Sequence, residues 1–259
     1  MDINKHLINF SKVLVLGRTT AEKSSIDASL NRLKNTIDKE LGIGIEEQLV
    51  FGSYSRNTIL PRNYDPNSDV DLMVIFDTEA KEYTPDTYRR RLYDVIAKNY
   101  PNSIIKKAFP VVKLELNHIM FDVIPAKRTN SFWSGESIYI PDSYNDWQET
   151  DPNDINNRLS EVNQSYGENT LRNVIRLCKH WNASFGYPFE SYLMEKELIE
   201  LNYNNEDTFS GFLYALDKIA DDIAGVRQAL DYIEDYIERD DYKKQILWLR
   251  KLLPLLPAQ

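Results

Sequence analysis

The apolar positions along the chain recur with two periods, and the change from one to the other divides the sequence. Between residues 20 and 41 they recur every third or fourth position, which predicts one long helix. Residues 68–76 alternate between polar and apolar side chains, which predicts a half-buried strand. From residue 153 onward the pattern is almost purely helical. We therefore predict an α/β fold of the α+β kind: a mixed sheet with an N-terminal helix over residues 1–150, and a helical lobe over residues 151–259.

Shorter patterns complete the first part of the chain. Residues 49–51 form an apolar run that predicts a short strand, and Gly52-Ser53 turns the chain into what we expect to be a helix start. Thr84-Pro85-Asp86 has the residue types typical of a helix start, so we predict a helix from there to Asn99. These segments predict helices that flank the sheet.

Two further strands are indicated after this helix. Residues 110–116 and 119–124 alternate and are joined by a tight connection at Asn117-His118, which predicts a hairpin. Residues 127–152 have neither period and contain one glycine, two prolines and two tryptophans. We interpret them as an irregular crossing between the two halves of the chain.

Candidate chemistry begins on the alternating strand. Asp69 and Asp71 are two residues apart, so both point to one face of the sheet while Val70 and Leu72 point to the other. Two adjacent carboxylates suit a hard divalent cation, Mg²⁺ above all, with Mn²⁺ as an alternative. Backbone N–H groups at the Gly52-Ser53 turn can bind phosphate, because a helix N-terminus offers unpaired donors. A phosphate site beside a metal pair predicts nucleotidyl transfer.

A third carboxylate, Asp122, lies between Phe121 and Val123 in an otherwise apolar strand. A carboxylate in such a place is costly unless it is paired or metal-bound. It can be bonded to the backbone or to a lysine, or it can be a metal ligand, and we favour the metal. Asp69, Asp71 and Asp122 are then the predicted catalytic ligands of two Mg²⁺ ions about 4 Å apart, with Asp122 also a candidate proton acceptor.

Composition narrows the partners. The 259 residues carry a net charge of −9, so we expect small nucleotides and do not expect a long nucleic-acid duplex. The one cysteine, Cys178, excludes an intramolecular disulfide and a cysteine-based zinc site. We find no apolar run of membrane-spanning length and no signal-peptide pattern, and we expect a cytoplasmic monomer.

These residues resemble the DNA polymerase β-like nucleotidyltransferase superfamily and, more narrowly, the bacterial CD-NTases of the SMODS type, relatives of cyclic GMP-AMP synthase. The resemblance covers most of the chain, through the 52–58 loop, the aspartate strand, residues 121–126, Trp147 with Asp151-Pro152, residues 171–181, and Ser191-Tyr192. One departure is Asn57, which stands where the family usually has glycine and which tolerates a left-handed conformation.

The resemblance implies roles for the remaining site residues, with the active site in the cleft between the sheet and the helical lobe. Gly52 and Ser53 would bind the donor triphosphate, and Lys179 and Ser191 would contact its phosphates. Tyr192 would stack on the donor base. The alternatives are a solvated helix face for Lys179 and a core aromatic for Tyr192.

The resemblance also implies an activity. The enzyme would join NTPs, ATP among them, into a cyclic di- or oligonucleotide that acts on a separate effector in anti-phage defence of the CBASS type, with an activating protein or ligand as a further partner. One alternative is a nucleotidyltransferase that modifies an RNA 3′ end, a protein or a small molecule. A second is a regulatory module that binds nucleotide without chemistry.

Overall fold

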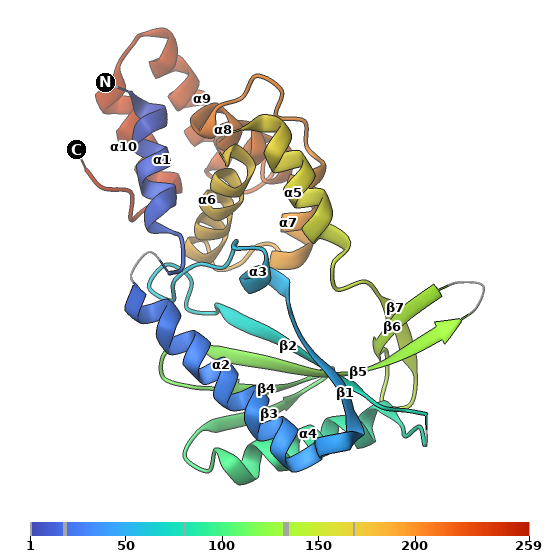
Figure 1. The fold of residues 1–259 in the computed structure, drawn as a ribbon. Helices are drawn as coiled ribbons and strands as arrows, with labels where there is room; N and C mark the ends of the chain where they lie inside the picture. The colour runs from blue at the N-terminus through green and yellow to red at the C-terminus, as the bar shows by residue number, and fades with distance from the viewer. Residues whose placement is uncertain (1, 18–19, 80, 132–134, 168, 259) are drawn as a thin grey trace. The chain divides into compact units, whose positions relative to one another are not determined.

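The computed structural model describes residues 2–17, 20–79, 81–131, 135–167 and 169–258, and Figure 1 gives its elements. The chain forms two compact units. Unit 1 consists of Met1–Arg18, Asn57–Pro66 and Ile155–Gln259, and unit 2 consists of Thr19–Arg56 and Asn67–Asp154. Residues 2–17 and the short 57–66 segment therefore pack with the C-terminal helices.

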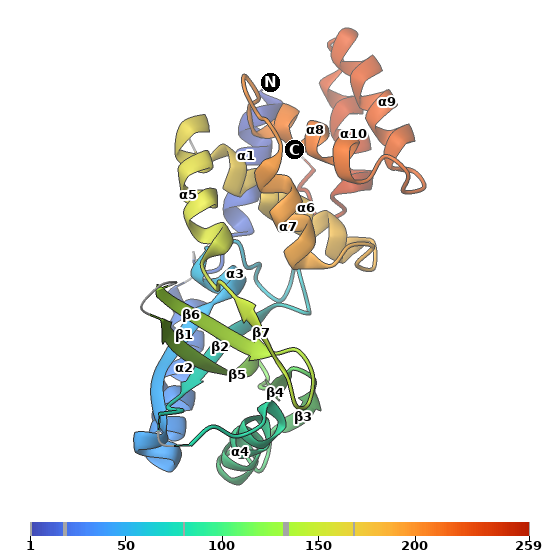
Figure 2. The same ribbon diagram turned by 90° about the vertical axis from the view of Figure 1, so that its right-hand side faces the viewer.

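Unit 2 is built on a mixed sheet, as the alternating pattern predicted. The strand order is β1-β2-β5-β4-β3, and β6 pairs with β5 and with β7. β2 and β5 are parallel, and the other neighbours are antiparallel. Figure 2 shows this part of the sheet, in which β6 lies next to β5 and β7 lies next to β6. The strands are β1 (Ile45–Phe51), β2 (Asp69–Phe76), β3 (Ile104–Ala108), β4 (Val111–Glu115), β5 (Met120–Ser131), β6 (Gly135–Pro141) and β7 (Trp147–Thr150).

Helices α2 (Thr20–Leu41) and α4 (Pro85–Asn99) cover one face of this sheet (Figure 1). α2 has the predicted bounds, and its buried residues Ile26, Leu30, Leu33 and Ile37 recur at helical spacing. α4 begins after Thr84 with Pro85 in its first turn, as predicted. Its Tyr88 ring lies 4.4 Å from the Phe76 ring of β2, so the even-numbered positions of β2 face the helices.

The opposite face of the sheet is polar at the start of β2 and apolar further along the strand. Asp69 and Asp71 lie at its start, and Met73 and Ile75 continue the same face as a small apolar core with Ile124 of β5. Residues of β6 pack on this core, which explains why β2 is buried on both faces beyond Asp71. The carboxylates are thus at the edge of an apolar patch.

The prediction that residues 127–152 form an irregular crossing is wrong. β5 continues to Ser131, and β6 and β7 form a hairpin that extends the sheet, while residues 132–134 lie outside the described part. Only a few positions of β6, such as Ile138 and Ile140, pack on apolar neighbours. The strand begins with the exposed residues Gly135 and Glu136, so the alternation is too short to be recognised. β3 was also not predicted, because its lysines hide the alternation.

Unit 1 is helical, as expected. Its helices are α1 (Ile3–Val13), α5 (Asp154–Tyr166), α6 (Thr170–Ser184), α7 (Ser191–Glu200), α8 (Thr208–Ile219), α9 (Val226–Glu238) and α10 (Tyr242–Leu252). α6 is central, since nearly all of its residues are buried, Cys178 and Trp181 among them. α1 was not predicted, although Leu7, Phe10 and Leu14 bury one face of it. No helix of the described residues is long and apolar enough to cross a membrane.

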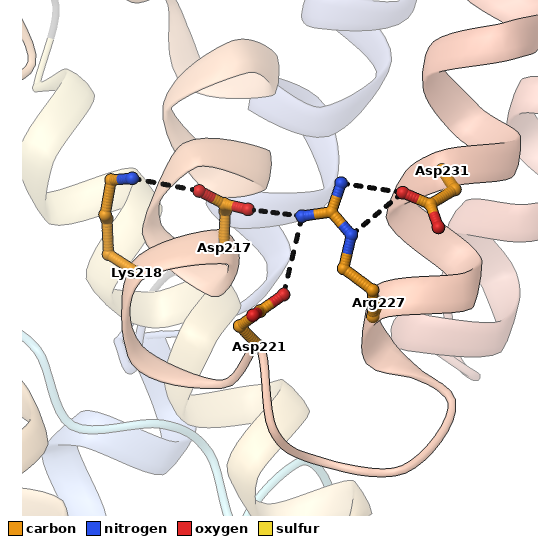
Figure 3. Close-up of polar contacts among 5 residues, drawn as sticks. All are labelled: Asp217, Lys218, Asp221, Arg227 and Asp231. Atoms are coloured by element: carbon orange, nitrogen blue, oxygen red, sulfur yellow. Dashed lines mark hydrogen bonds and ion pairs between the residues drawn. The ribbon is translucent and has the colours of Figure 1, made fainter.

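An ion-pair network closes the turn between α8 and α9 (Figure 3). Arg227 donates to Asp217 at 2.7 Å, to Asp231 at 2.6 Å and to Asp221 at 3.4 Å. Asp217 also accepts from Lys218 at 3.0 Å, and this hydrogen bond lowers the pKa of Asp217. The network is exposed, so it orients the turn more than it stabilises the unit.

Candidate active site

Two of the three predicted aspartates are direct neighbours in the sheet of unit 2. In the parallel pairing of β2 with β5, Asp71 is opposite Asp122, and Asp69 is opposite Met120. Adjacent strands lie about 4.8 Å apart, and Asp69 shares the face of Asp71 because the two are separated by one residue. The backbone therefore brings the three predicted ligands to one end of one face.

Asp122 has a second charged neighbour, which the sequence did not reveal. Lys113 of β4 lies opposite it in the antiparallel pairing, and Lys113 Nζ donates to Asp122 Oδ2 at 2.6 Å. The side chain of Asp122 is 13% exposed, and its other oxygen, Oδ1, is buried without a hydrogen-bond partner among the described residues. A buried acceptor in this state costs free energy. Oδ2 of Asp122 therefore has the lysine partner that we considered, whereas Oδ1 has no hydrogen-bond partner among the described residues.

The described side chains do not converge on one point. Among the described residues, no group of three or more His, Cys, Asp or Glu side chains is placed so that it could hold a metal ion. One physical reason is visible at Asp122, whose Oδ2 is directed to Lys113. The sheet thus supplies the neighbouring positions, and the side chains must turn before they share a cation.

Gly52 brings the predicted phosphate turn directly against this face. It is the first residue of the short helix α3 (Gly52–Ser55), which follows β1, and its φ is +69°. A Cβ at Gly52 would lie 1.9 Å from Oδ2 of Asp71 and 2.7 Å from its carboxyl carbon. No side chain fits there without displacing Asp71. Ser53, the other predicted phosphate residue, follows in the same helical turn.

A hydrogen-bonded group holds α3 on α2. The Tyr54 hydroxyl donates to Asp27, and Lys23 Nζ donates to the Tyr54 oxygen at 3.2 Å and to Asp27 at 3.0 Å. The bond from Tyr54 lowers the pKa of Asp27, while burial raises the pKa of Tyr54. Lys23 and Asp27 are four residues apart on a helix, and this spacing is the sequence signal that was missed.

The remaining predicted residues belong to unit 1. Lys179 is 5% exposed, and its Nζ lies 3.7 Å from Oε2 of Glu195, whose other oxygen, Oε1, accepts a hydrogen bond from Thr58 at 2.7 Å. Lys179 is therefore not on a solvated face. Ser191 is the first residue of α7, and Tyr192 is 41% exposed, so Tyr192 is not a core aromatic. Their predicted contacts with nucleotide stay predictions.

Asn57 adopts the left-handed conformation that its place in the loop predicted. Its φ is +58°, and its carbonyl oxygen accepts two hydrogen bonds from Arg176, at 2.8 and 3.2 Å. Both residues belong to unit 1. Asparagine replaces the usual glycine here without loss of the turn, since it tolerates positive φ.

A mixed sheet with two aspartates on one strand, a third on its parallel neighbour and a Gly-Ser turn against them defines a polymerase β-like nucleotidyltransferase fold. Solved structures share this fold. That of E. coli MS115-1 CdnC with ATP has a TM-score of 0.69 at 14% identity and covers 99% of both chains. That of Elizabethkingia meningoseptica CdnE with GTP and Apcpp has a TM-score of 0.62 at 18% identity, covering 85% of this chain and 84% of that one.

The family is shown by sequence. The model of the Second Messenger Oligonucleotide or Dinucleotide Synthetase domain matches residues 1–163, and the chain belongs to this family. A probable cyclic nucleotide synthase of Bacillus cereus (strain VD146) is 31% identical over 192 residues, 61% of this chain and 56% of that protein. The match therefore spans little more than half the length of this relative.

Proposed function

We propose that the protein is a nucleotidyltransferase that joins NTPs into a cyclic di- or oligonucleotide and releases pyrophosphate. Membership of the family supports the reaction class. The observation that carries the proposal is the contact of Gly52 with Asp71, because it sets a backbone turn suited to phosphate against a carboxylate suited to a metal.

The residues fit Mg²⁺, and Mn²⁺ would serve in the same way. Asp69, Asp71 and Asp122 offer hard oxygen ligands, and Oδ1 of Asp122 is a buried acceptor that a cation would satisfy. Two such ions, when bound, supply charge neutralisation and activation of the attacking hydroxyl. Asp122 would reach them by exchanging its bond to Lys113 for the metal.

The chemistry is an in-line displacement at phosphorus. A 3′- or 2′-hydroxyl oxygen of one nucleotide forms a bond to the α-phosphorus of another NTP, and the bond to the pyrophosphate oxygen breaks. The carboxylate of Asp122 is the proposed acceptor of the hydroxyl proton. Gly52 and Ser53 hold the donor phosphates through the first turn of α3. Repetition within the linear product closes the ring.

Three residues of unit 1 complete the proposed set. Tyr192 is 41% exposed, and we propose that its ring stacks on the donor base, while Ser191 offers a hydroxyl at the start of α7. Lys179 Nζ is directed to Glu195, so Lys179 must exchange this partner before it contacts a phosphate. We also propose that the product signals to a separate effector in anti-phage defence.

Synthesis by the full chain tests the function. Purified protein with Mg²⁺ and α-labelled NTPs should release pyrophosphate and yield labelled product that resists phosphatase. The double variant Asp69→Ala, Asp71→Ala should yield none, with an unchanged circular dichroism spectrum. Asp94→Ala, which removes an exposed carboxylate of α4, is the matched control and should retain activity. Product from the double variant would contradict the assignment, and label on an added RNA, protein or small molecule would contradict cyclic synthesis.

A further inference from the structure

Unit 1 contains a polar cavity that none of the predicted site residues lines. Its volume is about 620 Å³, which falls within the range of small-molecule sites. It is bounded by the C-terminal part of α1, by Asn57 and by the N-terminal half of α6. The lining residues are Ile8, Lys12, Val15, Asn57, Asn169, Arg172, Asn173 and Arg176.

The lining has a charge opposite to that of the chain. Three cations, Lys12, Arg172 and Arg176, contribute to it, and its residues include no carboxylate. The whole chain carries a net charge of −9. A concentrated positive charge inside an acidic protein raises the local concentration of anions. This cavity therefore selects for an anionic ligand.

Arg176 is the most buried of these cations. It is 6% exposed, and its guanidinium donates to the carbonyl of Asn57 and to Oδ1 of Asn173 at 3.3 Å, both neutral acceptors. Burial, together with the charge of Arg172 one turn earlier, lowers the pKa of Arg176 to about 10, although Glu195 opposes this. Within the described residues Arg176 has no ion pair. An anion beside it would offset this cost.

Arg172 has a donor that is still free of any partner in the described structure. Its Nη2 donates to Ser160 at 3.3 Å, but its Nε is buried without a hydrogen-bond partner. Burial lowers its pKa as well. A guanidinium presents paired donors that match phosphate oxygens. The first turn of the 15-residue helix α6 lies on the same wall, and its dipole favours an anion there.

We propose that this cavity binds a phosphate-bearing ligand of nucleotide size, separate from the catalytic nucleotides. Arg172, Arg176 and Lys12 bind its phosphate oxygens. The carboxamides of Asn57 and Asn169 offer donors and acceptors to a base edge, and Ile8 and Val15 provide an apolar wall. The site makes the helical unit a sensor of nucleotide in its own right.

The test measures binding without catalysis. The full chain carrying Asp69→Ala and Asp71→Ala is titrated calorimetrically, in EDTA, with inorganic phosphate, with ATP and with a cyclic dinucleotide. We expect ATP or the cyclic dinucleotide to bind without divalent metal. Lys12→Gln with Arg172→Gln should weaken this binding at least about tenfold, because charge-assisted hydrogen bonds are lost. Lys12→Gln alone should weaken the binding of the same ligand less than the double change. Because Lys12 is exposed, this single variant still tests the cavity if the double change unfolds the chain.

The matched control removes the same charge elsewhere on unit 1. Lys243→Gln with Arg250→Gln changes two exposed cations and should leave the affinity unchanged. Hydrogen exchange should slow on bound protein in α6 residues 171–176 and in the last turn of α1. Equal affinities of both double variants, no binding of any probe, or protection confined to other elements would overturn the site. Phosphate binding as tightly as ATP would overturn the nucleotide assignment. None of these outcomes depends on synthesis.

Discussion

At the scale of single residues, the site depends on a glycine, the residue type that has no Cβ atom. Gly52 has no side chain, and the carboxylate of Asp71 occupies the space where a Cβ would lie. Glycine is also required by the positive φ at this position. The turn and the carboxylate are therefore coupled, and a change in one moves the other.

Gly52→Ala should abolish or strongly reduce nucleotidyl transfer and should lower stability by about 1–3 kcal/mol, the cost of a strained backbone conformation. Denaturant unfolding and initial rates of pyrophosphate release measure the two effects. Gly44→Ala is the control, because φ is not positive at Gly44 and no atom lies within 4 Å of its added Cβ. Wild-type rates for Gly52→Ala would show that the contact with Asp71 has no role.

Lys113 also acts at this scale, because its ammonium group holds Asp122 by a hydrogen bond. Lys113→Met should destabilise the chain by about 1–3 kcal/mol, because the carboxylate of Asp122 loses a charge-assisted hydrogen bond. Mg²⁺ should restore more of the melting temperature in this variant than in the wild type, since both cations neutralise the same carboxylate. Equal Mg²⁺ shifts in the two proteins would mean that Lys113 and the metal do not share Asp122.

At the scale of elements, the position of α3 depends on α2. A four-residue helix cannot hold itself in place, and the Tyr54 hydroxyl fixes it to Asp27 and Lys23. The phosphate turn is thereby attached to the longest helix of unit 2. The same helix covers the far face of the sheet.

Tyr54→Phe should lower the free energy of unfolding by about 0.5–1 kcal/mol, the net worth of a partly exposed hydrogen bond, and should raise KM for NTP. The Tyr54 bond lowers the pKa of Asp27 in the folded state. The contribution of this hydrogen bond to the free energy of unfolding is therefore present above pH 3.8, the ordinary pKa of the carboxyl group. It is lost as the pH falls through the lowered pKa of Asp27. Unfolding at pH 7 and in strong acid, with Tyr93→Phe as control, checks this. A stability difference that persists in strong acid would contradict it.

How far the sequence predicts the elements depends on how complete their patterns are. α2 was predicted to the residue because four buried positions recur at helical spacing over its length. α1 was missed although Asp2 caps it and Leu7 and Phe10 are spaced as in a helix, since an 11-residue segment gives few repeats. β6 was missed because its first three residues, Gly135, Glu136 and Ser137, are not apolar, which leaves too short an alternation.

The candidate site could be predicted only in part, for a similar reason. Local alternation places Asp69 and Asp71 on one face, and an acid in an apolar strand marks Asp122. Long-range pairings leave no local pattern, so neither the bond of Lys113 to Asp122 nor the burial of Lys179 against Glu195 could be derived. Strand order and register decide the first, and helix packing decides the second.

At the scale of the whole molecule, two units carry two kinds of chemistry. Unit 2 contains carboxylates that suit metal binding and nucleotidyl transfer. Unit 1 contains a cationic cavity, although the whole chain has 40 Asp and Glu residues and 31 Lys and Arg residues. We propose that the carboxylate face of unit 2 makes a closed nucleotide product.

Mass spectrometry of the product formed from a mixture of all four NTPs with Mg²⁺ tests that claim most directly. We predict a species whose mass is the sum of two or more nucleoside monophosphates, each less one water, with no terminal phosphate, and we predict that the Asp69→Ala, Asp71→Ala protein forms none of it. Recovery of unchanged NTPs, of linear products that keep a triphosphate, or of the closed species from the double variant would contradict it.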